Sequence, residues 1–169
     1  SSEISFLHQN GIKILPIYSG FKEALGYRNG QIAARNAIFH AQRLGVPKNV
    51  FIFANVENFF PVDEAWIRGW VEVFYPSGYR PGFYHDPVKG NFSSAFCSAA
   101  KINNQVEIQS VLWSAEPELK PSKKAEAPAF DPTKPPCSAN VWAWQYGRDA
   151  EACPIDTNVI DTKLFDNLF

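Results

Sequence analysis

Residues 50–58 constrain the fold of this chain more than any other segment, because an apolar run there ends on polar side chains. Between Val50 and Val56 the residues are almost all apolar, aromatic or β-branched, which is typical of a strand covered on both faces. Asn55 and Glu57 follow two positions apart, so a strand would point both to the same face. The carboxyl ends of parallel strands carry the chemistry of α/β folds. Glu57 is therefore either a site residue or an exposed loop residue.

The rest of the chain alternates strand and helix patterns. Further strands are expected at residues 12–18, 80–86, 111–116, 141–146 and 158–160. Helices are expected at residues 30–44, after an N-cap at Asp63, and at 93–102. The helix after Asp63 carries a core-facing stripe of Ile67, Trp70, Val71 and Phe74. This alternation predicts βαβ units and a parallel sheet.

We expect one domain over residues 1–169, with a proline-rich surface excursion at residues 117–137. About six strands are visible, whereas a closed (β/α)₈ barrel needs eight. The sheet is therefore either open or lacks its first βα units. The chain begins at Ser1 within a helical pattern, which suggests a processed or truncated product.

Charge and composition exclude several classes of function. The formal net charge is −1 and no block of Lys and Arg occurs, so we expect no nucleic-acid partner. No apolar run reaches membrane-spanning length. The histidines are scattered and no Cys-x-x-Cys pair occurs, so we expect no metal and no cofactor. We expect a monomer.

The three cysteines indicate the redox environment. Cys137 and Cys153 flank one strand-like segment in polar or proline-rich loops, and we expect them to pair. Such a disulfide would imply an oxidising compartment, and hence a secreted or cell-envelope protein. The alternative is two free thiols. Cys97 is expected to be a buried core thiol.

Polar and aromatic side chains also follow the other expected strands. If the strands are parallel, these groups meet at one acidic and aromatic rim that suits a neutral, hydroxyl-rich ligand such as a sugar. Three residues keep an alternative: Trp113 as a core filler, Asp86 as a loop residue hydrogen-bonded with His85, and Asp156 as a turn residue. Besides Asn55 and Glu57, the candidates for this rim are Tyr18, Tyr84, Asp86, Trp113, Glu116, Gln145, Tyr146 and Asp156.

The order of several short motifs resembles the family 25 glycoside hydrolases, which are lysozyme-type muramidases. It is more similar still to a bacterial glycoside hydrolase-like domain related to them. The resemblance covers nearly the whole chain and rests on these segments in order: ILPIYSG, LGVP, IFANVE, GYRPGFY, VLWSAE, VWAWQYG and IDTNVID.

This resemblance implies a TIM-like (β/α) barrel with parallel strands and its site at their carboxyl ends, here incomplete at the N-terminus. The family's Asp-x-Glu pair matches Asn55 and Glu57, with Glu57 as the general acid. A further family Asp matches Asp156, and Tyr146 beside Gln145 would help to line the cleft. The implied function is hydrolysis of a peptidoglycan-like cell-wall polysaccharide.

One departure from the family pattern leaves a second function open. Asn55 replaces the first carboxylate of the pair, and an amide cannot act as an anionic base or nucleophile. The chain is therefore either a glycosidase or a non-catalytic carbohydrate-binding module of the cell envelope on a degenerate hydrolase scaffold.

Overall fold

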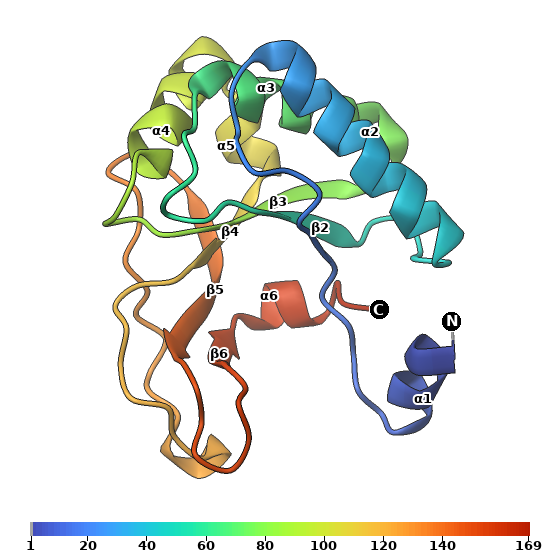
Figure 1. Ribbon diagram of the computed structural model, residues 1–169, viewed down its shortest axis with the longest axis vertical. Coiled ribbons are helices and arrows are strands. Elements are labelled where there is room, and N and C mark those ends of the chain that lie inside the picture. Colours follow the sequence, from blue (N-terminus) through green and yellow to red (C-terminus); the bar gives the residue numbers. More distant parts are fainter. Residues whose placement is uncertain (1) are drawn as a thin grey trace.

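A six-stranded sheet organises residues 2–169, which are the part of the chain that the computed structural model describes (Figure 1). Its strands lie side by side in the order in which they occur along the chain. The first five run parallel, and β6 is antiparallel to β5. The strands are β1 (Ile17–Tyr18), β2 (Phe51–Asn55), β3 (Arg80–His85), β4 (Val111–Ser114), β5 (Asn140–Gly147) and β6 (Thr157–Ile160).

Four helices cover one face of this sheet, and the short α6 lies on the other side (Figure 1). The helix α1 has no buried residue. The helices are α1 (Ser2–Gln9), α2 (Tyr27–Arg43), α3 (Glu64–Phe74), α4 (Phe92–Ile102), α5 (Gln105–Gln109) and α6 (Thr162–Phe165), with 3₁₀ turns η1 (Tyr75–Ser77) and η2 (Lys124–Glu126).

The predicted N-cap of α3 is confirmed. The Asp63 carboxylate accepts a hydrogen bond from the backbone N–H of Trp66 at 2.8 Å, which satisfies a donor that the first turn leaves free. The same carboxylate accepts the backbone N–H of Gly26, just before α2, at 2.9 Å. One side chain therefore holds the starts of two neighbouring helices.

Two elements differ from the sequence prediction. The strand expected at residues 12–18 shrinks to two residues, and β6 is antiparallel instead of parallel. A parallel return needs a crossover of about a dozen residues, whereas only residues 148–156 separate β5 from β6. The described strands form an open sheet, so the TIM-like barrel stays a prediction.

The two faces of the sheet bury separate hydrophobic clusters. On β2, Ile52 and Ala54 pack with the helices, whereas Phe51 and Phe53 belong to a smaller cluster on the opposite face. Gly82 of β3 lies beside Phe53, and a Cβ atom there would lie only 2.8 Å from the phenyl ring. By the two-residue period of a strand, the smaller cluster leads directly to Asn55.

The end of the chain covers this second face. Leu164 of α6 is fully buried in the smaller cluster. Beyond α6, Phe169 exchanges two backbone hydrogen bonds with Ile14, which precedes β1. The C-terminal segment therefore connects the two ends of the sheet across its face.

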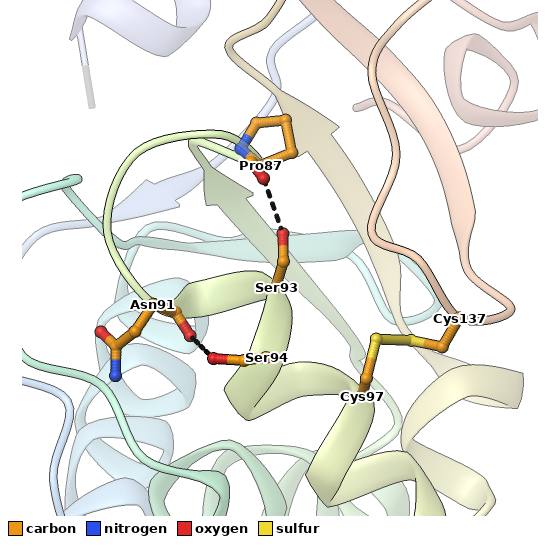
Figure 2. Close-up of a disulfide and its surroundings, with 6 residues drawn as sticks. All are labelled: Pro87, Asn91, Ser93, Ser94, Cys97 and Cys137. Atoms are coloured by element: carbon orange, nitrogen blue, oxygen red, sulfur yellow. Dashed lines mark hydrogen bonds between the residues drawn. A yellow bond between two sulfur atoms is a disulfide. The ribbon is translucent and has the colours of Figure 1, made fainter.

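The predicted disulfide between Cys137 and Cys153 is wrong, because Cys137 is bonded to Cys97 (Figure 2). The eight residues of β5 stand between Cys137 and Cys153, and an extended strand of that length spans roughly 25 Å. Disulfides need Cα atoms within about 7 Å, and those of Cys97 and Cys137 are 5.7 Å apart. Cys97, expected as a free core thiol, is buried but oxidised, and Cys153 is exposed and free.

Candidate functional site

A cleft of about 250 Å³ opens where the parallel strands end, on the sheet face away from α2–α5. It collects side chains from β1 to β5, from the loop after β5 and from β6. Six of them are residues that the sequence predicts for the site. The lining consists of Ile17, Asn55, Glu57, Tyr84, Trp113, Gln145, Arg148, Asp156 and Asn158.

Asn55 and Glu57 lie side by side in this cleft. The amide Nδ2 of Asn55 donates a hydrogen bond of 3.0 Å to Oε1 of Glu57. Both side chains are half-buried, so the protein orients the carboxylate while part of it stays accessible. The Oδ1 atom of Asn55 is an acceptor available to a ligand.

A second carboxylate, that of Asp156, lines the cleft next to β5 and β6. Asp156 follows the loop after β5, and its Oδ2 accepts a 3.0 Å hydrogen bond from Nε2 of Gln145 on β5. Gln145 is buried and Asp156 is exposed, so a rigid strand residue positions a carboxylate in a loop.

Tyr84 and Trp113 form an aromatic wall. Their rings meet edge to face with centroids 5.1 Å apart, and the Trp113 indole N–H donates to Oδ1 of Asn158 at 2.9 Å. Burial raises the pKa of the Tyr84 phenol above its ordinary value, and the nearby Glu57 carboxylate adds to this shift. Tyr84 therefore stays a neutral hydroxyl that can donate or accept.

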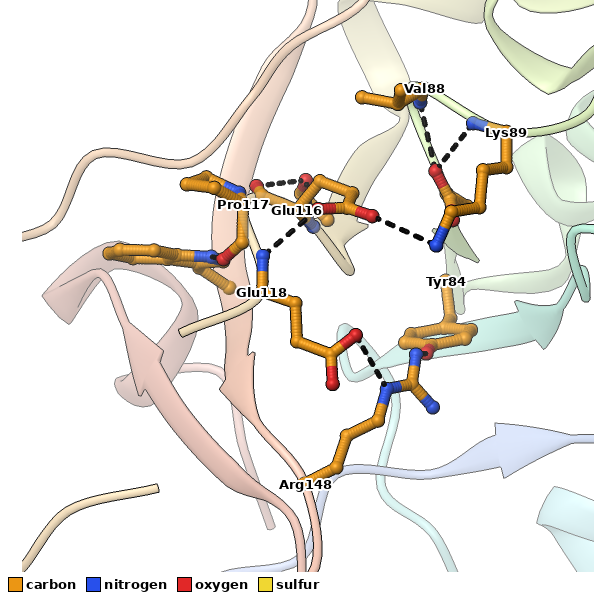
Figure 3. Close-up of polar contacts among 10 residues, drawn as sticks. Tyr84, Val88, Lys89, Glu116, Pro117, Glu118 and Arg148 are labelled. Carbon is orange, nitrogen blue, oxygen red and sulfur yellow. Dashed lines mark hydrogen bonds and ion pairs between the residues drawn. The ribbon is translucent and has the colours of Figure 1, made fainter. Parts of the chain in front are cut away.

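The sequence prediction missed Arg148 and Asn158. Arg148 comes just after β5, and its guanidinium donates to the Tyr84 hydroxyl at 3.4 Å. Its Nε also lies 3.6 Å from a carboxylate oxygen of Glu118, at the start of the proline-rich excursion (Figure 3). Both missed residues stand within three positions of a predicted candidate, so listing the neighbours of Tyr146 and Asp156 would have found them.

Two other predicted site residues, Tyr18 and Tyr146, do not line the cleft. The Tyr18 ring packs in the helix-side cluster, 6.3 Å from the ring of Trp70. Tyr146 is buried, and its hydroxyl is 3.0 Å from the hydroxyl of Ser122 in the excursion. Tyr146 follows Gln145 directly on β5, and alternate residues of a strand face opposite ways.

The remaining two predicted residues, Asp86 and Glu116, stabilise loops at the strand ends. Asp86 accepts the backbone N–H groups of Val88 and Lys89, each at 2.8 Å. Glu116 accepts the backbone N–H of Glu118 and pairs with Lys89 at 3.6 Å. Neither lines the cleft.

Within residues 2–169, no three His, Cys, Asp or Glu side chains come together as a potential metal site. No helix in the same range is long and apolar enough to cross a membrane.

Comparison with known proteins places this cleft in a family context. The family model described as "Rv2525c-like, glycoside hydrolase-like domain" matches residues 1–142. That match includes Asn55, Glu57, Tyr84 and Trp113, while the cleft residues from Gln145 onward lie beyond it.

A solved structure extends the comparison over nearly the whole chain. The chain is similar to an uncharacterized B. stearothermophilus protein whose crystal structure was determined at 1.07 Å. The two are 59% identical with a TM-score of 0.98, over 99% of this chain and 79% of that one. No curated protein matches.

Proposed function

We propose, from the premise that this chain belongs to the family of Rv2525c-like glycoside hydrolase-like domains, that it hydrolyses a peptidoglycan-like cell-wall polysaccharide. The observation that carries the proposal is the oriented, half-buried Glu57 at the end of β2, in a cleft with a second carboxylate and an aromatic wall. Sugar sites combine stacking faces with carboxylates in this way.

In the proposed reaction Glu57 is the general acid. Its carboxylic acid protonates the glycosidic oxygen while the bond from that oxygen to the anomeric carbon breaks. The carbonyl oxygen of a neighbouring N-acetyl group attacks the same carbon and forms a cyclic intermediate. Water then opens the intermediate and gives its proton to the Glu57 carboxylate.

The other polar groups of the cleft support this chemistry. Asp156 stabilises the positive charge of the oxocarbenium-like transition state. Oδ1 of Asn55 accepts the N–H of the substrate acetamide, because its Nδ2 is already bonded to Glu57. In this proposal Asn55 positions the substrate and takes no part in proton transfer.

The test is Glu57→Gln, which keeps the shape of the side chain but cannot deliver a proton. We expect release of reducing ends from purified peptidoglycan to fall by roughly 10²- to 10⁴-fold. Glu126→Gln is the control, because it removes one exposed carboxylate outside the cleft. Undiminished hydrolysis by Glu57→Gln would contradict the assignment.

A second candidate function is glycan binding without turnover, on a degenerate hydrolase scaffold. It is favoured by the two cleft carboxylates, each of which is hydrogen-bonded to a side-chain amide. In that case the wild-type protein binds muropeptides without cleaving them, and Glu57→Gln changes no rate. Measured turnover above that of a heat-denatured sample would exclude it.

We also propose a secreted or cell-envelope location. The Cys97–Cys137 disulfide supports it, because such bonds persist in oxidising compartments. The relation to family 25 muramidases is a proposal of the same kind, supported by a cleft at the carboxyl ends of parallel strands. The monomeric state and the absence of a nucleic-acid partner stay predictions.

A further inference from the structure

Among the described residues that line the cleft, Arg148 is the only Lys or Arg. We infer that its guanidinium binds a carboxylate carried by the glycan, so that the site prefers acidic glycans over neutral ones. This inference rests on the proposed glycan function of the cleft and adds the charge of the substrate to it.

The guanidinium has unused hydrogen-bonding capacity. It carries five N–H donors in a planar fork. The described contacts are one hydrogen bond to the Tyr84 hydroxyl at 3.4 Å and one ion pair to Glu118 at 3.6 Å. Charge-assisted hydrogen bonds are usually about 2.7–2.9 Å long, so both contacts are loose.

The contact with Tyr84 keeps the guanidinium beside the cleft. Tyr84 is buried, and its ring lies against Trp113. Its hydroxyl is a fixed point on β3, and Figure 3 shows the Arg148 guanidinium next to it. A cation placed there meets a ligand that stacks on the aromatic wall.

Glu118 is the group that a ligand carboxylate would replace. Its side chain and that of Arg148 are 46% and 44% exposed, and exposed ion pairs of this kind are weak. Glu118 also comes from the start of the irregular excursion, whereas Arg148 follows a strand directly. A ligand carboxylate that forms two parallel bonds with the guanidinium outcompetes one long contact.

The two cleft carboxylates limit where an anion can bind. Asp156 lines the same cleft as Arg148. Burial lowers the pKa of Arg148, but Tyr84, Glu118 and, to a smaller extent, Asp156 raise it, so the pKa lies above its ordinary value. Glu57 is bonded to Asn55, at the end of β2. An anionic substituent is therefore accepted only beside Arg148, which favours one orientation of the glycan.

A carboxylate next to a sugar ring has two chemical sources. In a uronic acid its carbon is bonded directly to a ring carbon, and in a muramic acid it is the end of an ether-linked lactyl arm. Both present the same planar group to a guanidinium, so the experiment includes one probe of each kind.

The test measures dissociation constants by calorimetry for three disaccharides and one derivative. The probes are diacetylchitobiose, a hyaluronan disaccharide, the disaccharide of N-acetylglucosamine and N-acetylmuramic acid, and the methyl ester of the last. We expect the wild-type protein to bind at least one acid about tenfold or more tightly than the neutral probes. The acid that is preferred identifies the source of the carboxylate.

Three variants assign this preference to a residue. Arg148→Gln should remove it, because the affinity for the preferred acid falls about tenfold more than the affinity for diacetylchitobiose. Glu118→Gln should increase it by a few fold, because the competing carboxylate is gone. Glu126→Gln removes an equal charge from the excursion outside the cleft and should change nothing.

The outcomes separate this inference from the proposed function. Equal affinity of the wild-type protein for the acids and the neutral probes overturns the inference and leaves glycan binding intact. An equal loss of affinity for acidic and neutral probes in Arg148→Gln also overturns it, because the residue is then only structural. Failure to bind any glycan overturns both the inference and the proposed function.

Discussion

Tyr84 and His85 are neighbours on β3 whose side chains face opposite sides of the sheet. Tyr84 lines the cleft, whereas the His85 ring lies 4.5 Å from that of Phe92 on the helix side. His85 is fully buried, and neither ring nitrogen has a hydrogen-bond partner within the described residues. Burial lowers the pKa of His85 to about 4, so the folded protein holds a neutral imidazole at neutral pH.

This buried imidazole predicts a pH-dependent stability. The unfolded chain binds a proton at His85 near pH 6.5 and the folded chain only near pH 4. Between these two pH values the unfolded chain binds the proton and the folded chain does not. Protonation of His85 therefore does not affect the free energy of unfolding above pH 6.5, and lowers it by about 3 kcal/mol in all as the pH falls towards 4. Urea unfolding at several pH values between 7 and 4 measures the slope.

Two substitutions assign that slope. His85→Gln should flatten it, although it also lowers the stability at pH 7. His40→Gln, at an exposed histidine of α2, should leave the slope as it is. The same slope in His85→Gln and in the wild-type protein would contradict the assignment to His85.

For single residues, the sequence indicated Asn55 and Glu57 but not every residue around them. Asn55 and Glu57 were found because the two-residue period of a strand is local and needs no tertiary information. Arg148 was missed because the expected strand ended at Tyr146, whereas β5 continues to Gly147. Arg148 therefore directly follows the strand and is not in a distant loop. Tyr146 was expected beside Gln145 in the cleft but is buried outside its lining, because the face of a single strand residue depends on which neighbour packs inward.

Among the elements, α4 is covalently attached to the loop before β5. The Cys97–Cys137 bond joins residues 40 positions apart. On the chain-entropy model, a loop of that length gives roughly 4 kcal/mol by restricting the unfolded chain. The bond therefore stabilises the junction between the helical layer and the last parallel strand.

Removal of this bond should be costly. Cys97→Ser is expected to lower the free energy of unfolding by about 2–5 kcal/mol. Chemical denaturation under non-reducing conditions measures the change. Cys153→Ser is the matched control, since Cys153 is exposed and unpaired, and it should have little effect. Equal stability of the Cys97→Ser and Cys153→Ser variants would contradict the role of the bond.

Element types were predictable where the pattern is strong and local. The stripe of α3 is fully buried as expected, because four apolar positions at helical spacing leave one solution. The five-residue α5 was missed, since one turn of helix carries too little periodicity. The cysteine pairing was wrong because it depends on which elements are neighbours in space, and the sequence does not show this.

For the whole molecule, the C-terminal segment completes the smaller of the two hydrophobic clusters. Leu164 is fully buried there with Phe51, Phe53, Val111 and Ala143 of the sheet. No pattern in the sequence indicated that a four-residue helix would cover the sheet face opposite α2–α5. This cover lies below the cleft and supports the strands that end in it.

Truncation of Leu164 tests this support. Leu164→Ala should lower the free energy of unfolding by about 2–5 kcal/mol, because it opens a cavity in a packed cluster. Ile102→Ala removes a similar volume from a side chain that is 60% exposed, and should cost far less. Urea titrations of both variants supply the comparison, and equal losses would show that α6 is not essential to the cluster.

The sequential order of the strands has a consequence for how the molecule forms. Each of the first five strands pairs with the next one along the chain, so each parallel pairing closes one crossover and does not depend on strands far away in the sequence. The pairing of Ile14 with Phe169 is the exception, because it joins segments that flank all six strands of the sheet. We therefore expect the closure of the C-terminal segment to be a late event in folding, after the parallel strands have assembled in order.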